Sequence, residues 1–365
     1  MTLLLPPTEQ KNLNKVWETD FMNTLLLQDT QQDIEKAGQI LSQGGLVGIP
    51  TETVYGLAAD ALNGKAVAKI FVAKGRPMDN PLIVHIKDIK DINKYGLVRE
   101  FSTKAKLLAE NFWPGPLTII MPKGDCIPDE VSAGLDTVAI RFPEHQIARR
   151  IIEAANTPLA APSANLSGSP SPTTANHVLN DLNGRIDAVL DGGRCRVGLE
   201  STVITLATPT PKLLRPGGVT LEEMKEVIGE IEVDKAVLNQ IESGAVVSSP
   251  GMKYKHYAPK ARVILLKGSD RAYREYVNSH ADYNVAALCY DSDIIGLNTT
   301  TFSMGDKNDY ETQAHKLFSS LRKIDKESRI DVVYARCPEP KGLGMAVYNR
   351  LIRAAGFEVK DLEEV

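Results

Sequence analysis

Cysteine is scarce in this sequence, and long apolar runs are missing from it. The four cysteines, at positions 126, 195, 289 and 337, are scattered over 365 residues, so no pair has the spacing of a zinc-binding knuckle. Scattered cysteine is typical of a reducing compartment. No window approaches the ~20 consecutive apolar residues of a membrane-spanning helix, and the first residues lack the basic start and the cleavage region of a signal peptide. We therefore expect a cytoplasmic protein that makes no membrane contact.

The sequence also lacks a large net charge of either sign, and it lacks the familiar catalytic motifs. The 42 basic and 46 acidic residues give a formal net charge of −4, whereas proteins that coat nucleic acid are more often basic. The sequence contains no G-x-x-x-x-G-K-[ST] phosphate loop, no well-placed G-x-G-x-x-G, no G-x-S-x-G elbow and no H-E-x-x-H motif. The groups available for catalysis are therefore arginine, lysine and histidine side chains, hydroxyls and backbone amides. They favour catalysis by positioning and charge neutralisation at phosphorus over covalent catalysis.

The chain is long enough for two domains, at the usual ~100–200 residues per domain. Residues 1–30 are predicted to form an irregular N-terminal extension. Over residues 31–229, strand-like and helix-like segments alternate, which predicts an α/β domain with a mixed sheet. Residues 230–260 are rich in serine, glycine and proline and are predicted to be a linker. Strands and helices alternate again over residues 261–365, which predicts a smaller three-layer α/β domain.

Two segments near the ends of predicted strands carry polar residues that a core does not need. Residues 50–57, PTETVYGL, offer two threonine hydroxyls and a glutamate, which suit a small polar ligand, although an ordinary turn explains them equally well. Lys74 and Arg76 stand two apart in an extended segment, so both point to the same side. With Asn80 and His85 nearby they suit a polyphosphate. The alternative is a solvated helix C-terminus.

Arginines and small residues mark the other strand ends of the first predicted domain. Arg141 interrupts the apolar strand predicted over residues 138–142 and needs a partner there. That partner is either a structural carboxylate or the carboxylate of a ligand. Residues 160–168, AAPSANLSG, combine small residues with hydroxyls and can form an anion cradle. Ser201 and Arg215 add a hydroxyl and a guanidinium at strand ends further along the chain.

Five of these segments, taken in order, closely resemble the YrdC-like family; they are residues 50–57, 74–82, 162–168, 200–202 and 215–217. The predicted linker, residues 249–259, and the α/β block after it resemble the long, two-domain form of the family's threonylcarbamoyl-AMP synthases. The resemblance covers residues 31–362. It implies an open, twisted mixed α/β sheet with a basic concave face, followed by a Rossmann-like domain.

The resemblance also implies a nucleotidyltransferase reaction. L-Threonine, bicarbonate and ATP give L-threonylcarbamoyl-AMP and pyrophosphate, the first step of threonylcarbamoyladenosine modification of tRNA next to the anticodon. ATP brings Mg²⁺, and neither a protein-bound metal nor an organic cofactor is expected. A separate tRNA threonylcarbamoyl transferase uses the product, and weak RNA binding is left open.

Residue roles follow from the same resemblance. The groups near the reacting phosphates are Lys74, Arg76 and Arg215. The residues that hold L-threonine are Thr53, His85, Arg141, Ala161 and Ser201. The residues that meet ATP are Arg76, Asn80, Thr137, Ser163, Ser171 and Arg215, together with His256 and Tyr257 of a linker that folds over the nucleotide.

Three competing interpretations are set against this one. A basic concave face suits double-stranded RNA, whose binding falls steeply between ~50 and 200 mM salt. A carbamoyl-transferring maturation enzyme also contains a YrdC-like domain, but it carries zinc-finger regions that four scattered cysteines do not provide. A third interpretation concerns the second domain alone: residues 261–362 show no comparable polar cluster and are expected to serve as a docking or regulatory module without chemistry of their own.

Overall fold

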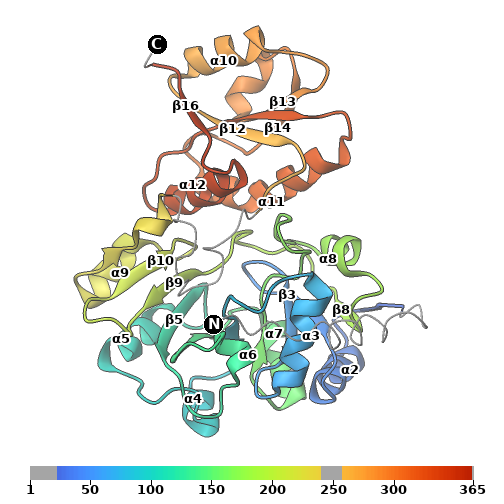
Figure 1. Ribbon diagram of the computed structural model, residues 1–365, viewed down its shortest axis with the longest axis vertical. Coiled ribbons are helices and arrows are strands. Elements are labelled where there is room, and N and C mark those ends of the chain that lie inside the picture. The colour runs from blue at the N-terminus through green and yellow to red at the C-terminus, as the bar shows by residue number, and fades with distance from the viewer. Residues whose placement is uncertain (1–22, 240–256, 364–365) are drawn as a thin grey trace.

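The computed structural model describes residues 23–239 and 257–363, and these form two stacked α/β units (Figure 1). The first unit is built on an eleven-stranded mixed sheet with the order β1-β8-β2-β3-β7-β4-β6-β5-β9-β10-β11. Its strands are β1 Leu25–Leu27, β2 Val47–Ile49, β3 Gly56–Asp60, β4 Ile83–His85, β5 Leu117–Pro122, β6 Thr137–Arg141, β7 Leu159–Ala160, β8 Ala188–Leu190, β9 Thr202–Thr205, β10 Lys212–Arg215 and β11 Glu232–Val233. The mixed sheet expected from the sequence is therefore confirmed.

The helices of the first unit begin and end at residues that the sequence marks clearly. They are α2 Gln31–Ser42, α3 Gly64–Lys74, α4 Lys90–Tyr95, α5 Thr103–Phe112, α6 Asp129–Ser132, α7 Gln146–Ala155, α8 Ala175–Leu182 and α9 Leu221–Ile228, with a short 3₁₀ helix, η1, at Lys235–Val237. The Thr30 side chain accepts from the backbone of Asp33 and caps α2. Thr220 and Glu223 form a reciprocal capping box at α9.

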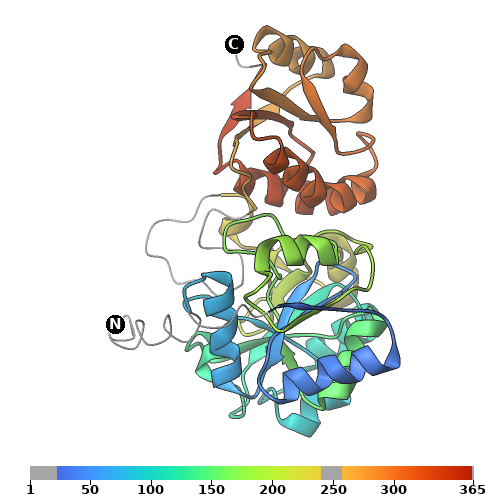
Figure 2. The same ribbon diagram turned by 90° about the vertical axis from the view of Figure 1, so that its right-hand side faces the viewer.

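The second unit is a five-stranded, all-parallel sheet with the order β14-β13-β15-β12-β16. Its strands are β12 Arg262–Lys267, β13 Val285–Cys289, β14 Thr300–Ser303, β15 Val332–Arg336 and β16 Val359–Asp361. Its helices are α10 Asp270–Ser279, α11 Tyr310–Lys326 and α12 Leu343–Ala354, with a 3₁₀ helix, η2, at Asp291–Gly296. The two views place α11 and α12 between this sheet and the first unit, and α10 on the far side of the sheet (Figures 1 and 2). The three-layer prediction is thus confirmed.

Some elements differ from those that the sequence predicts. The extension expected over residues 1–30 is not irregular throughout, because Leu25–Leu27 form β1, which pairs in parallel with β8. The predicted linker is also partly ordered, since Glu232–Val233 form β11 beside β10 and η1 follows. Short strands at the edge of a sheet carry too few alternating residues to show in a sequence pattern. None of the described helices is long and apolar enough to span a membrane.

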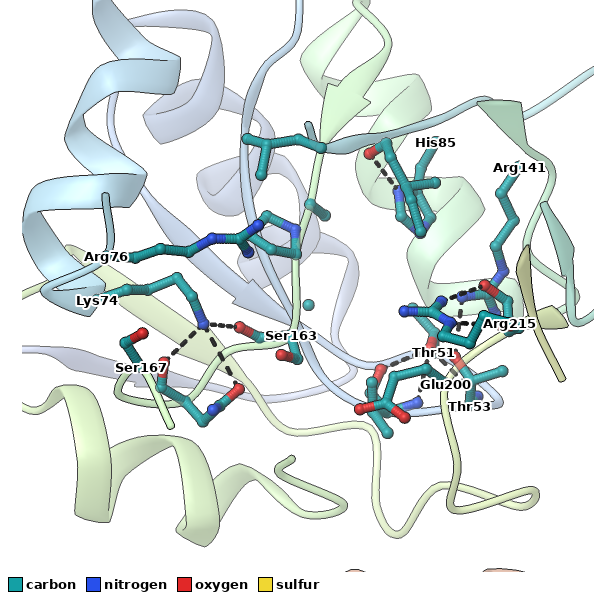
Figure 3. Close-up of a pocket in the computed structure, with 18 of the residues that line it drawn as sticks. Thr51, Thr53, Lys74, Arg76, His85, Arg141, Ser163, Ser167, Glu200 and Arg215 are labelled. Carbon is teal, nitrogen blue, oxygen red and sulfur yellow. Dashed lines mark hydrogen bonds between the residues drawn. The ribbon is translucent and has the colours of Figure 1, made fainter. Parts of the chain in front are cut away.

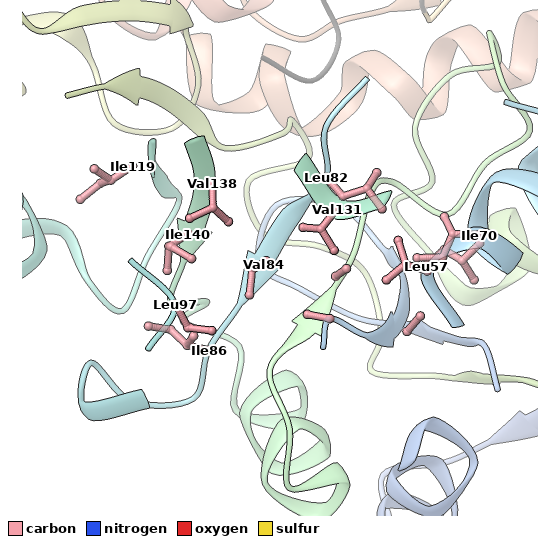
Figure 4. Close-up of a cluster of buried hydrophobic side chains, with 14 of the residues drawn as sticks. Leu57, Ile70, Leu82, Val84, Ile86, Leu97, Ile119, Val131, Val138 and Ile140 are labelled. Atoms are coloured by element: carbon pink, nitrogen blue, oxygen red, sulfur yellow. The ribbon is translucent and has the colours of Figure 1, made fainter. Parts of the chain in front are cut away.

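The core of the first unit determines where its polar residues can lie. Leu57, Ile70, Val84 and Ile140, together with other apolar side chains from β3 to β6 and α3, form one buried cluster (Figure 4). A second cluster joins α2 and α7 to β1, β2 and β8. Val84 and Ile140 place one face of β4 and β6 in the first cluster, whereas Ile83, His85 and Arg141, at the alternate positions, line a cavity on the other face.

The Ile140→Ala substitution is expected to lower the free energy of unfolding of the first unit by about 2–5 kcal/mol, because Ile140 is fully buried and its removal leaves a cavity. Urea unfolding followed by tryptophan fluorescence measures this, since both tryptophans, at positions 17 and 113, precede the second unit in the sequence. Leu107→Ala is the control: Leu107 is 37% exposed, so its replacement should cost about 0.5 kcal/mol or less. Equal losses in the two variants would contradict the assignment of the core.

Candidate active site

A pocket in the first unit gathers the strand-end residues that the sequence singles out (Figure 3). It encloses about 770 Å³ of space between protein atoms, part of it open to solvent. The segment between β2 and β3 supplies Thr51 and Thr53, and α3 and the turn after it supply Lys74 and Arg76. The loop after β7 supplies most of residues 161–169, all except Ala164 and Leu166. The ends of β4, β6 and β10 add His85, Arg141 and Arg215.

Lys74 and Arg76 enter the pocket from one side (Figure 3). Helix α3 ends at Lys74, and Gly75 takes a left-handed conformation with φ of 61°, which lets the chain turn so that Arg76 also reaches the pocket. The Lys74 ammonium donates to the carbonyl oxygens of Ser163 and Asn165, the latter at 2.6 Å. Burial, with the neighbouring charge of Arg76, lowers the pKa of Lys74 well below its ordinary value. Lys74 therefore shapes the 163–165 loop in this structure, and its contact with a phosphate stays a prediction.

Arg141 lies on the opposite side of the pocket, at the end of β6, and is nearly fully buried. Its Nη2 donates to Glu52 Oε1 at 2.6 Å and its Nη1 to Thr53 Oγ1 at 2.8 Å. Burial alone raises the pKa of Glu52, but the adjacent Arg141 outweighs it, so the pKa lies below the ordinary value. The structural carboxylate that the sequence offered as one partner is therefore present. A ligand carboxylate beside the same guanidinium stays a prediction.

Ser201 and Arg215 complete this side of the pocket. Arg215 donates from Nε to the carbonyl oxygen of Ser201 at 3.0 Å and from Nη2 to its hydroxyl at 3.1 Å. Burial lowers the pKa of Arg215 to about 10, so the side chain remains charged at neutral pH. Residues 215–217 press closely on residues 200–202, because a Cβ at Gly217 would lie 2.3 Å from the backbone nitrogen of Thr202. Only glycine fits at that approach.

His85 is buried in the pocket wall, with Nδ1 3.2 Å from the carbonyl oxygen of Ile83. Burial, and then the charge of Arg141, lower the pKa of His85 to about 3. The imidazole is therefore neutral at physiological pH and can act as a hydrogen-bonding group but not as a cation. Because the pKa is lower in the folded than in the unfolded chain, His85 makes stability fall as the pH drops from about 6.5 towards 3.

The Cε1 proton resonance of His85 is accordingly expected to show no titration between pH 5 and pH 9. Proton NMR across this range tests it, with His85→Gln used to assign the signal. A titration with a midpoint near pH 6.5 would contradict the burial of a neutral imidazole. The pH profile of any activity at this pocket should likewise carry no limb that disappears in His85→Gln.

The structure brings most of the predicted site residues together in one lining. These are Thr53, Lys74, Arg76, His85, Arg141, Ala161, Ser163, Ser201, Arg215 and Tyr257. Asn80, Thr137 and Ser171 lie outside it: Thr137 begins β6, at whose other end Arg141 stands, and the Ser171 hydroxyl donates to Glu200, which does line the pocket. Their contacts with ATP stay predictions. His256 falls outside the described residues.

The polar lining residues without an assigned ligand from the sequence are Thr51, Asn165, Ser167, Ser169 and Glu200. Glu200 is the most informative, because a buried carboxylate needs a cation. That cation is Arg350, whose Nε lies 2.8 Å from Glu200 Oε2. Glu200 belongs to the resembling segment 200–202, so its position was marked. The sequence contained no local signal of a partner 150 residues away.

Comparisons with known proteins identify the family of this chain. The Sua5_yciO_yrdC family model, described as telomere recombination, matches residues 39–217. The Sua5_C model, described as the C-terminal domain of threonylcarbamoyl-AMP synthase, matches residues 219–356. The threonylcarbamoyl-AMP synthase of Pyrococcus abyssi is 45% identical and covers 89% of this chain and 95% of its own length. This chain belongs to the threonylcarbamoyl-AMP synthase family.

Two further relatives match this chain over nearly their whole length. The threonylcarbamoyl-AMP synthase of Bacillus subtilis is 44% identical, over 94% of this chain and 99% of its own. The crystal structure of P. abyssi Sua5 complexed with L-threonine is similar with a TM-score of 0.85 at 44% identity, covering 93% of this chain and 99% of that chain. The family, the α/β fold and the enzyme class expected from the sequence are thus confirmed. The match to the C-terminal domain of threonylcarbamoyl-AMP synthase sets aside the carbamoyl-transferring maturation enzyme, whereas RNA binding stays a prediction.

Proposed function

We propose that this chain joins L-threonine, bicarbonate and ATP into L-threonylcarbamoyl-AMP and pyrophosphate in the pocket described above. One observation carries the proposal: a single cavity has cationic side chains on two opposite sides, Lys74 and Arg76 on one and Arg141 and Arg215 on the other (Figure 3). This arrangement suits two anionic ligands, an amino acid and a polyphosphate, whose reacting ends meet between them. Family membership and the L-threonine bound to P. abyssi Sua5 support it.

L-Threonine would lie on the Arg141 side. Its carboxylate would share the Arg141 guanidinium with Glu52, since a guanidinium offers five N–H donors and Glu52 accepts from only one terminal nitrogen. The hydroxyls of Thr53 and Ser201 and the neutral His85 would meet its polar groups. Ala161 lies on the loop after β7, where its small side chain leaves room for the ligand.

ATP would lie with its phosphates between Lys74 and Arg76 on one side of the pocket and Arg215 on the other. Ser163 and Tyr257 line the same space, and we assign Asn80, Thr137, Ser171 and His256 to ATP as well. Mg²⁺ would enter on the phosphates of ATP, because Glu200, the carboxylate in the lining, is already paired with Arg350. Among the described residues, no group of three or more histidine, cysteine, aspartate or glutamate side chains is placed to hold a metal ion.

The chemistry needs little more than positioning. The threonine amine adds to bicarbonate with loss of water, which forms an N–C bond and gives a carbamate. A carbamate oxygen then attacks the α-phosphorus, and the bond to the departing pyrophosphate breaks. Because the carbamate is already an anion, that second step requires no general base. Each cationic donor that meets charge developing on the phosphate oxygens contributes about 3–4 kcal/mol in comparable sites. A tRNA threonylcarbamoyl transferase would consume the product.

Pyrophosphate release by the pure protein tests the proposal, with L-threonine and bicarbonate each omitted in turn. We expect release from ATP only when both are present. Release that ignores threonine would replace the proposal with nucleotide hydrolysis or another acceptor. Absence of release in every mixture, together with RNA binding that weakens from 50 to 200 mM salt, would favour the binding-module interpretation.

A further inference from the structure

Helix α12 of the second unit brings buried polar side chains to the surface of the first unit. Asn349, Arg350 and Arg353 are all buried. Asn349 Nδ2 donates to the carbonyl oxygen of Val237 at 2.6 Å, and Arg353 Nη2 donates to that of Ala236 at 2.7 Å. Both acceptors lie in η1, before the part of the chain that the structure does not describe. These contacts join the two units but do not involve the lining of the pocket.

Arg350 differs from its two neighbours because one of its acceptor residues, Glu200, lines the pocket and the other, Pro216, follows the lining residue Arg215. Its Nε donates to Glu200 Oε2 at 2.8 Å and its Nη2 to the carbonyl oxygen of Glu200 at 3.2 Å. Its Nη1 donates to the carbonyl oxygen of Pro216 at 2.7 Å. One guanidinium therefore joins two separate segments of the first unit, the one before β9 and the one after β10.

These two segments carry side chains that line the pocket. Glu200 precedes Ser201 and Pro216 follows Arg215, and both Ser201 and Arg215 line the pocket. The Arg350 guanidinium carbon also lies 5.9 Å from the centre of the Tyr257 ring, another lining group, which packs 5.2 Å from Phe318 of α11. Through Arg350 and Phe318 the second unit thus contacts two lining residues, Glu200 and Tyr257.

The chemistry of this contact is unusual for a junction that only holds two domains together. A fully buried guanidinium and carboxylate lose their hydration, and apolar residues of similar size often serve as well or better for adhesion. Charged hydrogen bonds, however, fix the relative orientation of the groups they join. The three hydrogen bonds described from Arg350 to the first unit all end on Glu200 or Pro216. The arrangement fixes backbone geometry beside the pocket.

We propose that Arg350 is a positioning residue, through which the second unit holds Ser201 and Arg215 in the geometry that the reaction requires. The inference rests on the proposed function of the pocket. It assigns the second unit a part in the reaction, in contrast to the sequence-based interpretation of that unit as a module without chemistry. It also predicts that weakening this one contact changes kinetic parameters, whereas weakening another contact between the units does not.

The ionisation of Glu200 provides a second readout, the pH profile of activity, which would not change if Arg350 only held the two units together. The charged and titratable groups facing its carboxylate are Arg350 from α12, Arg215 from β10, Tyr257 from the linker and Lys74 from α3. Burial raises the pKa of Glu200, but Arg350 and then Arg215 outweigh it, so the pKa lies below the ordinary value. Removal of Arg350 would therefore raise the pKa of Glu200 and move the acid limb of the pH profile to higher pH.

The experiment compares Arg350→Gln, Arg350→Lys and Arg194→Gln in threonine- and bicarbonate-dependent pyrophosphate release by the full chain. Arg350→Gln should lower kcat about 30-fold or more and move the acid limb upward by about one pH unit. Arg350→Lys should restore the position of the acid limb but not kcat, because one ammonium cannot reproduce the forked contact with both segments. Arg194→Gln is the matched control, since Arg194 donates across the same junction to His315 and Ser319; it should retain activity within about twofold.

The double variant Glu200→Gln/Arg350→Gln guards against simple misfolding, because it removes both buried charges together. It should unfold at a temperature near that of Arg194→Gln and still show the loss of kcat. Recovery of wild-type kcat in the double variant would overturn the inference, as would an Arg350→Gln enzyme with the kcat and pH profile of Arg194→Gln. Failure of the proposed function is a different result: the wild-type chain itself would then show no threonine-dependent release.

Discussion

The Arg141→Ala substitution is expected to lower kcat/KM for L-threonine by about 10²- to 10³-fold, mainly through KM. The reason is that the variant loses charge-assisted hydrogen bonds to the carboxylate of the amino acid. KM for ATP should change little, because the polyphosphate is assigned to Lys74, Arg76 and Arg215. Steady-state pyrophosphate release with each substrate varied in turn measures both constants. An unchanged KM for threonine would mean that Arg141 serves only as the ion-pair partner of Glu52 and does not bind the substrate.

Arg141→Ala has a structural cost that must be separated from this effect. It leaves Glu52, which is 3% exposed, as a buried and unpaired carboxylate, and such losses cost about 3–5 kcal/mol. The double variant Glu52→Gln/Arg141→Gln removes both charges and tests binding in a chain without that penalty. It should fold and still require at least 100-fold more threonine for the same rate. Wild-type KM in this folded double variant would contradict the assignment of the carboxylate to Arg141.

The Arg76→Ala substitution is expected to lower kcat/KM for ATP by about 10²- to 10³-fold, because one cationic donor to the phosphates is lost. Arg76 is partly exposed, and Arg76 Nη2 donates to the carbonyl oxygen of Asn80 at 3.2 Å. Because the side chain is only partly buried, the unfolding temperature of the variant should stay within a few degrees of the wild type. KM for threonine should be nearly unchanged. The kinetic experiment is the one used for Arg141.

Arg99→Ala is the matched control for Arg76→Ala. The Arg99 side chain is 56% exposed, and its ion pair with Asp125 at 4.0 Å joins two exposed groups, a contact of little energetic consequence. It removes the same charge from the same unit without touching the pocket. If Arg99→Ala weakened ATP use as much as Arg76→Ala, the effect would be one of overall charge. The assignment of Arg76 to the phosphates would then fail.

The sequence predicts the fold well where its elements are long and periodic. The alternation of helices and strands predicted over residues 31–229 is present, with α7 at residues 146–155 and α8 at residues 175–182. Strand β3, Gly56–Asp60, was not foreseen, because its glycine and alanines lack the β-branched side chains that mark a strand and it follows a segment that also suits a turn. The whole sheet depends on it, since β3 links β2 to β7.

The sequence predicts a site residue where its position within its own strand is enough to place it. His85, Arg141 and Arg215 stand at strand ends, and the structure places all three in the pocket. Thr137 shows the limit of that reasoning: it shares β6 with Arg141, but it begins the strand and does not line the cavity. The pairing of Glu200 with Arg350 could not be predicted, because it joins residues from different domains whose contact depends on how the units pack.

Incorporation of labelled bicarbonate is the most direct test of the central claim that one pocket unites three substrates. The pure wild-type chain would be incubated with ¹³C-bicarbonate, L-threonine and ATP, and the products analysed by mass spectrometry. The account predicts one species that contains threonine, the labelled carbon and AMP, formed only when all three substrates are present and reduced at least 100-fold in Arg141→Ala and in Arg76→Ala. AMP and pyrophosphate without a labelled adenylate, or a labelled adenylate formed equally well by both variants, would contradict it.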